Sequence, residues 1–131
     1  MASTKDDAAR RRAERRARIR AKINELQSEI DHLESCKREL FVAKSDLAAV
    51  EAEINNAMQV TENVNANLSG QYPGNRYNNL ISPHIENILA FKGGIKSNIT
   101  AYRNELNVAI NDLEDAINAR VSEINYYQDQ L

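Results

Sequence analysis

The densest cluster of charged side chains in this chain is the group of basic residues near its N-terminus. Residues 1–22 hold nine basic and three acidic side chains, a net charge of +6, and since the whole chain carries -2, the remainder carries -8. Guanidinium groups at this density bind phosphates or acidic protein surfaces. We therefore predict a basic arm over residues 1–22, a solvated helix end being the alternative; its arginines are Arg10, Arg11, Arg12, Arg15, Arg16, Arg18 and Arg20.

No set of residues predicts catalysis or metal binding. His32 and His84 have no second ligand at helical spacing that would make a metal site. The single Cys36 cannot form an internal disulfide and is expected on a helix flank. The glycine-containing segments lack the lysine and the strand of a phosphate-binding loop. We expect a non-enzymatic protein with no catalytic residue, metal or cofactor.

The composition predicts one all-α domain. The chain has 131 residues with only four Gly and two Pro, too few turn-forming residues for a β-sandwich or an α/β fold. No apolar run approaches the roughly 18 residues of a membrane span. We expect no membrane insertion and a cytoplasmic location, from which the chain could leave together with a partner.

Two long segments carry helical periodicity. In the first, successive leucines and one isoleucine occupy the d positions of a heptad repeat, while the a positions weaken towards the middle. The apolar stripe is wider than a strict a/d seam, which suits a helix that packs in a hairpin and against something more. We expect four of its d-position leucines to lie in the hairpin core or to face a partner: Leu26, Leu33, Leu40 and Leu47.

The second segment follows the 3.6-residue period from Ile95 to Leu131. Ser82-Pro83 predicts an N-cap followed by proline at the first helical position, with a short helical piece over residues 75–81 before it. Gly93-Gly94 interrupts the pattern, either as a tolerated weakness or as a close approach of another backbone. In an antiparallel register these glycines would lie opposite Ala57.

The segment LSGQYPGNRYNNL at residues 68–80 is the one place where the chain can turn between the two helices. A short connection makes the helices antiparallel neighbours. The predicted fold is therefore an all-α, long, coiled-coil-like two-helix hairpin with a basic N-terminal helical extension. Its predicted divisions are the arm at 1–22 and the hairpin domain at 23–131, with the turn at about 68–83.

Two antiparallel helices with an aromatic-x-Gly turn resemble the WXG-type, or Esx-like, helical hairpins of type VII secretion. The likeness is closer to the YwqH-like proteins that accompany LXG toxins in Gram-positive bacteria. Tyr72 stands in the place of the family's Trp, Gly74 in that of its Gly, and Tyr77 in the aromatic place that follows. The resemblance extends over about residues 20–131 and implies that these three residues contribute to partner recognition.

The family's YxxxD/E export tail is absent, because Gln130 follows Tyr126 four residues later. The resemblance therefore implies a targeting chaperone, which binds the helical N-terminal domain of an LXG-type toxin and promotes its export. A second small helical protein is a further implied partner. Two alternatives stay open: a basic-zipper-like nucleic-acid-binding coiled coil using Arg10–Arg20, and a self-assembling coiled-coil structural protein. Salt dependence separates them, since only phosphate binding falls steeply with salt.

Overall fold

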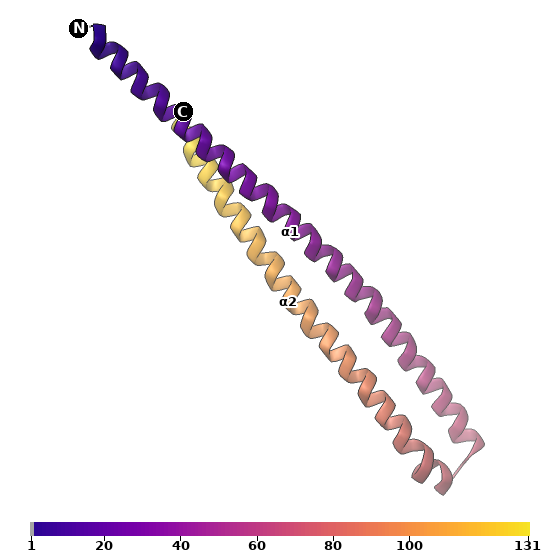
Figure 1. Cartoon of the computed structure of the whole chain (residues 1–131). Coiled ribbons are helices and arrows are strands. Elements are labelled where there is room, and N and C mark those ends of the chain that lie inside the picture. Colours follow the sequence, from indigo (N-terminus) through magenta and orange to yellow (C-terminus); the bar gives the residue numbers. More distant parts are fainter. Residues whose placement is uncertain (1) are drawn as a thin grey trace. The chain divides into compact units, whose positions relative to one another are not determined.

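The computed structural model describes residues 2–131, with side chains from Thr4 onward. It contains the α-helix α1 (Ala2–Gln71), the π-helical segment η1 (Tyr77–Ile81) and the α-helix α2 (Ser82–Asp129), and no strand in that range (Figure 1). The predicted fold class, an all-α helical hairpin, is confirmed. The arginines at 10–20 belong to α1 itself, and the separate function of residues 1–22 stays a prediction. Across residues 2–131, no helix combines the length and the apolar character that crossing a bilayer requires.

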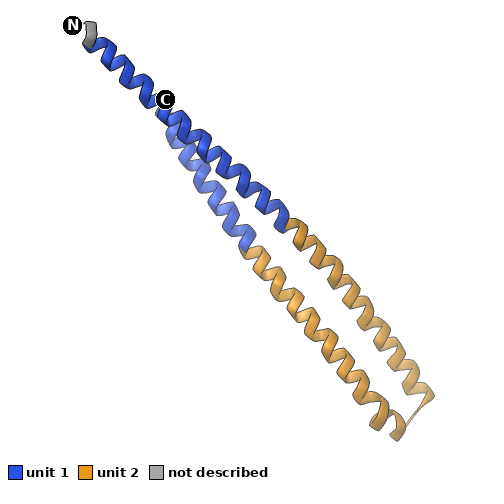
Figure 2. Ribbon diagram, in the orientation of Figure 1, with its two compact units in different colours: residues 1–40, 109–131 blue, residues 41–108 orange. Residues whose placement is uncertain are grey.

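The chain forms two compact units (Figure 2). Unit 1 contains residues 1–40 and 109–131, and unit 2 contains residues 41–108. In each unit, a part of α1 lies antiparallel to a part of α2. In unit 1 this direction is visible in the ion pairs Arg120–Glu29 and Lys37–Glu114, since the α2 number falls as the α1 number rises.

Unit 1 has an apolar core. Leu26 and Ile30 of α1 pack with Ile117 and Ile124 of α2, and partly buried side chains cover this cluster. Leu26 is only 2% exposed. Ile19, which lies inside the predicted basic arm, is also buried, so the buried stripe of α1 begins among the arginines.

Unit 2 has a much more polar seam between its helices. Its buried apolar residues are Ile85 and Ile99, and the buried Thr61 shares the seam with them. Lys92 Nζ donates hydrogen bonds to Thr61 Oγ1 at 2.7 Å and to the Ala57 carbonyl oxygen at 3.1 Å. Hydrogen bonds to charged groups are stronger than neutral ones, and such polar contacts fix the register of two helices more than they stabilise them.

A second polar contact in unit 2 joins Arg103 of α2 to Glu51 of α1. Both side chains are less than one-third exposed. Glu51 occupies one of the heptad a positions at which the apolar pattern of the first helix weakens, and a charge pair takes the place of an apolar layer there.

The turn consists of Tyr72, Pro73 and Gly74. Gly74 has a φ of 82°, a left-handed conformation that glycine adopts without the penalty of a Cβ. The Asn78 N–H donates to the Gly74 carbonyl oxygen at 3.0 Å, so helical structure resumes at once. The short helical piece predicted at 75–81 is confirmed, and its last five residues are the π-helical η1.

The N-cap predicted at Ser82 is wrong. Ser82 has helical backbone angles (φ -55°, ψ -41°), and its N–H donates to the Tyr77 carbonyl oxygen, an i to i−5 bond. Proline in a regular α-helix lacks an N–H, and its ring clashes with the carbonyl four residues earlier. The wider π turn before Pro83 accommodates the ring and lets the helix continue.

Gly93 and Gly94 lie in α2 with no atom within 4 Å of a Cβ built on either one. Of the two interpretations of this site, the close approach of another backbone is therefore wrong, and the tolerated local weakness remains. The predicted register is confirmed, because the neighbouring Lys92 bonds to the carbonyl of Ala57.

We expect the double substitution Gly93→Ala/Gly94→Ala to raise the free energy of unfolding by about 1–2 kcal/mol, because each alanine removes the entropic cost of a helical glycine. Urea denaturation followed by circular dichroism measures the change. Gly74→Ala is the matched control and should destabilise, since its positive φ disfavours a side chain. A loss of stability in the double variant would show that the glycines are needed for packing.

Candidate partner-binding surface

The three turn residues singled out from the sequence differ in their surroundings. Tyr72 is 40% exposed, and Gly74 is also exposed. Tyr77 is half-buried, and its hydroxyl donates a hydrogen bond to Asn65 Oδ1 of α1. Tyr77 therefore ties η1 to α1, while the ring of Tyr72 is available to a partner.

The four d-position leucines lie at different depths. Leu26 is in the core of unit 1, and Leu33 packs against that core. Leu40 and Leu47 are half-buried. We predicted that these leucines lie in the hairpin core or face a partner, and Leu26 and Leu33 lie in the hairpin core.

Exposed apolar side chains gather in unit 2 at regular helical spacing. On α1, Val50 and Val64 lie three residues after the d positions Leu47 and Thr61. On α2, Ile88 and Tyr102 lie three residues after the buried Ile85 and Ile99. Two more exposed apolar residues, Val60 and Phe91, lie three residues after Ala57 and Ile88. We define the lateral face by these six residues: Val50, Val60, Val64, Ile88, Phe91 and Tyr102.

The six side chains lie on one side of unit 2. A step of three residues turns an α-helix by 300°, which is 60° short of a full turn. Antiparallel helices wind in opposite senses when viewed from one end, so the same step from the facing positions leads to the same side of both. The Lys92–Thr61 contact sets the register that places Val64 across from Ile88.

The exposure of the lateral face is large for apolar side chains. Phe91 is 72% exposed, and the other members range from 42% for Ile88 to 60% for Val60. Isolated surface hydrophobics are ordinary, but a gathered patch marks an interaction site.

The opposite side of unit 2 has no such patch. Between residues 47 and 100, the residues that directly follow the seam positions there are small or polar: Ala48, Asn55, Glu62, Glu86, Gly93 and Thr100. Phe41, which directly follows Leu40, is an exposed apolar side chain on that opposite side. The apolar side chains of the middle of unit 2 are therefore gathered mainly on the side of the lateral face.

The lateral face has an acidic border at one end. Asp46 and Glu53 lie four residues before and three residues after Val50, Glu105 lies three residues after Tyr102, and all three are exposed. Lysine and arginine are absent from the positions on this side of unit 2, which are 43, 46, 50, 53, 57, 60 and 64 on α1 and 88, 91, 95, 98, 102 and 105 on α2. Charge at an interface rim selects partners and orients them, so this border favours a positively charged one.

The arginines of the predicted basic arm are exposed along α1 in unit 1. Arg12, Arg15 and Arg16, together with Gln130 and Leu131, line a hollow of about 140 Å³. Arg16 lies one turn before the buried Ile19 and Arg12 lies two turns before it, and both occupy core positions of the heptad repeat. Charge thus replaces the apolar stripe where α2 ends.

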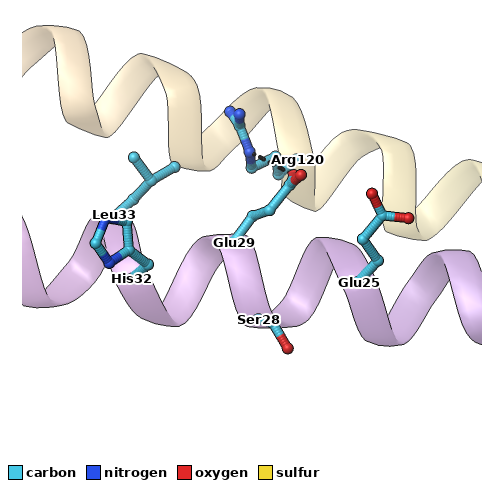
Figure 3. A pocket seen from close by; sticks show the side chains of 6 residues that line it. All are labelled: Glu25, Ser28, Glu29, His32, Leu33 and Arg120. Carbon is cyan, nitrogen blue, oxygen red and sulfur yellow. Dashed lines mark hydrogen bonds and ion pairs between the residues drawn. The ribbon is translucent and has the colours of Figure 1, made fainter.

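A larger hollow of about 560 Å³ lies on unit 1, and its lining side chains are shown in Figure 3. The guanidinium of Arg120 donates to Glu29 Oε2 at 2.9 Å there, so its strongest polar groups already satisfy each other. His32 Nε2 lies 3.8 Å from Cys36 Sγ one turn away. Two ligands do not make a metal site, and among the residues that the structure describes no group of three or more His, Cys, Asp or Glu side chains could hold a metal ion.

Ile88 and Phe91 were not predicted as surface residues. On a helical wheel they lie about 60° and 120° from Ile85, so their place follows once Ile85 is known to be buried. Comparison of the chain with protein-family models, with curated proteins and with solved structures finds no match.

Proposed function

We propose that the chain is a non-enzymatic adaptor, which binds the helical N-terminal domain of an LXG-type toxin and promotes its export by a type VII secretion system. The observation that carries this proposal is the lateral face of unit 2, where large apolar side chains are exposed on one side of a helical hairpin. A further helix is the partner that such a face fits best.

The turn supports the same proposal. Tyr72 and Gly74 hold the places of the aromatic and glycine residues of the WXG-type turn, and the ring of Tyr72 is exposed. The polar seam of unit 2 also supports it, because a hairpin with two buried apolar residues gains stability from a partner that buries more apolar surface.

Deletion of the gene in its native host tests this function. The expected result is that an LXG-type toxin accumulates inside the cells and falls in the culture medium, while plasmid-borne wild-type chain restores export. Unchanged toxin in the medium of the deletion strain would contradict the proposal.

A second candidate function, nucleic-acid binding through Arg10–Arg20, is favoured by the exposure of these arginines along α1. The basic stretch has no Asn or Gln to pair with an adenine edge, so binding would depend mainly on phosphates. Fluorescence anisotropy with a labelled DNA duplex at 50 and 200 mM salt tests it: phosphate binding should weaken by orders of magnitude between these concentrations.

A further inference from the structure

We propose that the lateral face of unit 2 is the docking surface for one amphipathic helix whose apolar stripe is bordered by lysine or arginine side chains. This inference rests on the proposed function, because it names the surface that the adaptor uses and the chemistry of the partner segment that covers it.

The dimensions of the face define the occupant. The rows from Val50 to Val64 on α1 and from Ile88 to Tyr102 on α2 each span 14 residue steps. At 1.5 Å per residue this is about 21 Å, or four helical turns. A helix of roughly 15–20 residues with apolar side chains at i, i+3/i+4 and i+7 would contact both rows at once.

The anchor positions come from exposure. Phe91 and Ile88 of α2 lie next to Val60 and Val64 of α1 in the register set by the Lys92–Thr61 contact. Aromatic and aliphatic side chains that cluster near the centre of a patch carry most of the energy of an interface. Phe91 is the most exposed of these side chains, so a partner could bury a larger fraction of its surface than of the others.

The acidic border gives the charge of the occupant. Asp46 of α1 and Glu105 of α2 lie opposite each other in the antiparallel register, and Glu53 lies two turns along α1 from Asp46. Lysine or arginine side chains beside the occupant's apolar stripe would complement these carboxylates. A second copy of the chain would present the same acidic border without a lysine or arginine, so its lateral face lacks this complementarity.

Two synthetic peptides are the probes. Both are 21-residue helices with the same leucine and isoleucine stripe; one has lysines on each side of the stripe and the other has glutamates. Fluorescence anisotropy with the full chain is expected to show binding of the lysine peptide, about five- to tenfold tighter than the glutamate peptide at low salt. Equal affinity for the two peptides would overturn the assignment of charge.

Variants of the full chain identify the face. Ile88→Asp/Phe91→Asp is expected to weaken binding of the lysine peptide about 30-fold or more. The control Ala90→Asp/Thr100→Asp puts the same two charges at exposed positions on the opposite side of α2 and should bind like the wild type. Far-UV circular dichroism should give the same helicity for both variants, since all four sites are exposed. Equal losses in the two variants would overturn the proposed surface.

Light scattering tests the alternative occupant. A wild-type dimer that becomes monomeric on Ile88→Asp/Phe91→Asp would show that a second copy covers the face, and would overturn the proposal. Because the peptide measurements need no toxin, they are independent of the export assay. If the chain binds the lysine peptide but the deletion strain exports the toxin normally, the proposed function is contradicted and the docking surface is not. If the deletion strain loses export but the chain does not bind the peptide, the docking surface is contradicted and the function is not.

Discussion

Leu26→Ala is expected to lower the free energy of unfolding by about 2–5 kcal/mol, the largest change we predict for a single substitution. Leu26 is 2% exposed and packs with Ile30, Ile117 and Ile124 in the core of unit 1. The substitution deletes apolar groups that are buried between the helices and leaves a cavity, which the two helices can fill only partly by moving closer together.

Chemical denaturation followed by circular dichroism measures this loss. Leu80→Ala is the matched control, because it makes the same truncation at a side chain that is 64% exposed. The control should stay within about 0.5 kcal/mol of the wild type. Equal effects of the two substitutions would show that the core cluster does not stabilise the hairpin.

Arg103→Glu is expected to destabilise unit 2 by about 1–3 kcal/mol. The substitution places a carboxylate beside Glu51, where both groups are less than one-third exposed and the attraction across the seam becomes repulsion. The effect should be smaller in high salt, because part of the repulsion is screened by solvent.

The charge-swapped variant Glu51→Arg/Arg103→Glu separates the pair from each side chain alone. We expect it to recover most of the stability that Arg103→Glu loses, which a double-mutant cycle from urea denaturation quantifies. If the swapped variant were as unstable as the single variant, the ion pair would not account for the loss.

Much of the fold follows from local sequence signals. The d-position leucines predicted the apolar stripe of α1; Leu26 is buried, and Leu33, Leu40 and Leu47 are half-buried. The scarcity of turn residues, with Tyr72-Pro73-Gly74 at the middle of the chain, predicted the single reversal and the fold class. The predicted register, which sets the Gly93-Gly94 site level with Ala57, was correct because an antiparallel register is fixed once the turn is placed.

The details that sequence patterns missed depend on contacts between the helices. Serine is a common N-cap residue, but the five residues before Ser82 already form the π-helical η1, so α2 continues directly from it and Ser82 caps no free helix end. Ile19 lies among arginines and looked like part of a charged arm, yet it is buried.

The candidate surface was only partly predictable for the same reason. Hydrophobic periodicity shows that α2 is amphipathic, but it does not show which apolar residues face α1 and which lie to the side. Phe91 and Ile88 are assigned to the lateral face only when Ile85, Lys92 and Ile99 are known to line the seam.

The measurement that tests the adaptor function most directly is affinity capture of the tagged chain from nuclease-treated native cells, with mass spectrometry of the co-eluting proteins. The wild type and Ile88→Asp/Phe91→Asp are compared in parallel. We predict that the wild type recovers one large LXG-type protein with a helical N-terminal region, and that the variant does not. Recovery of the wild-type chain alone would contradict the account.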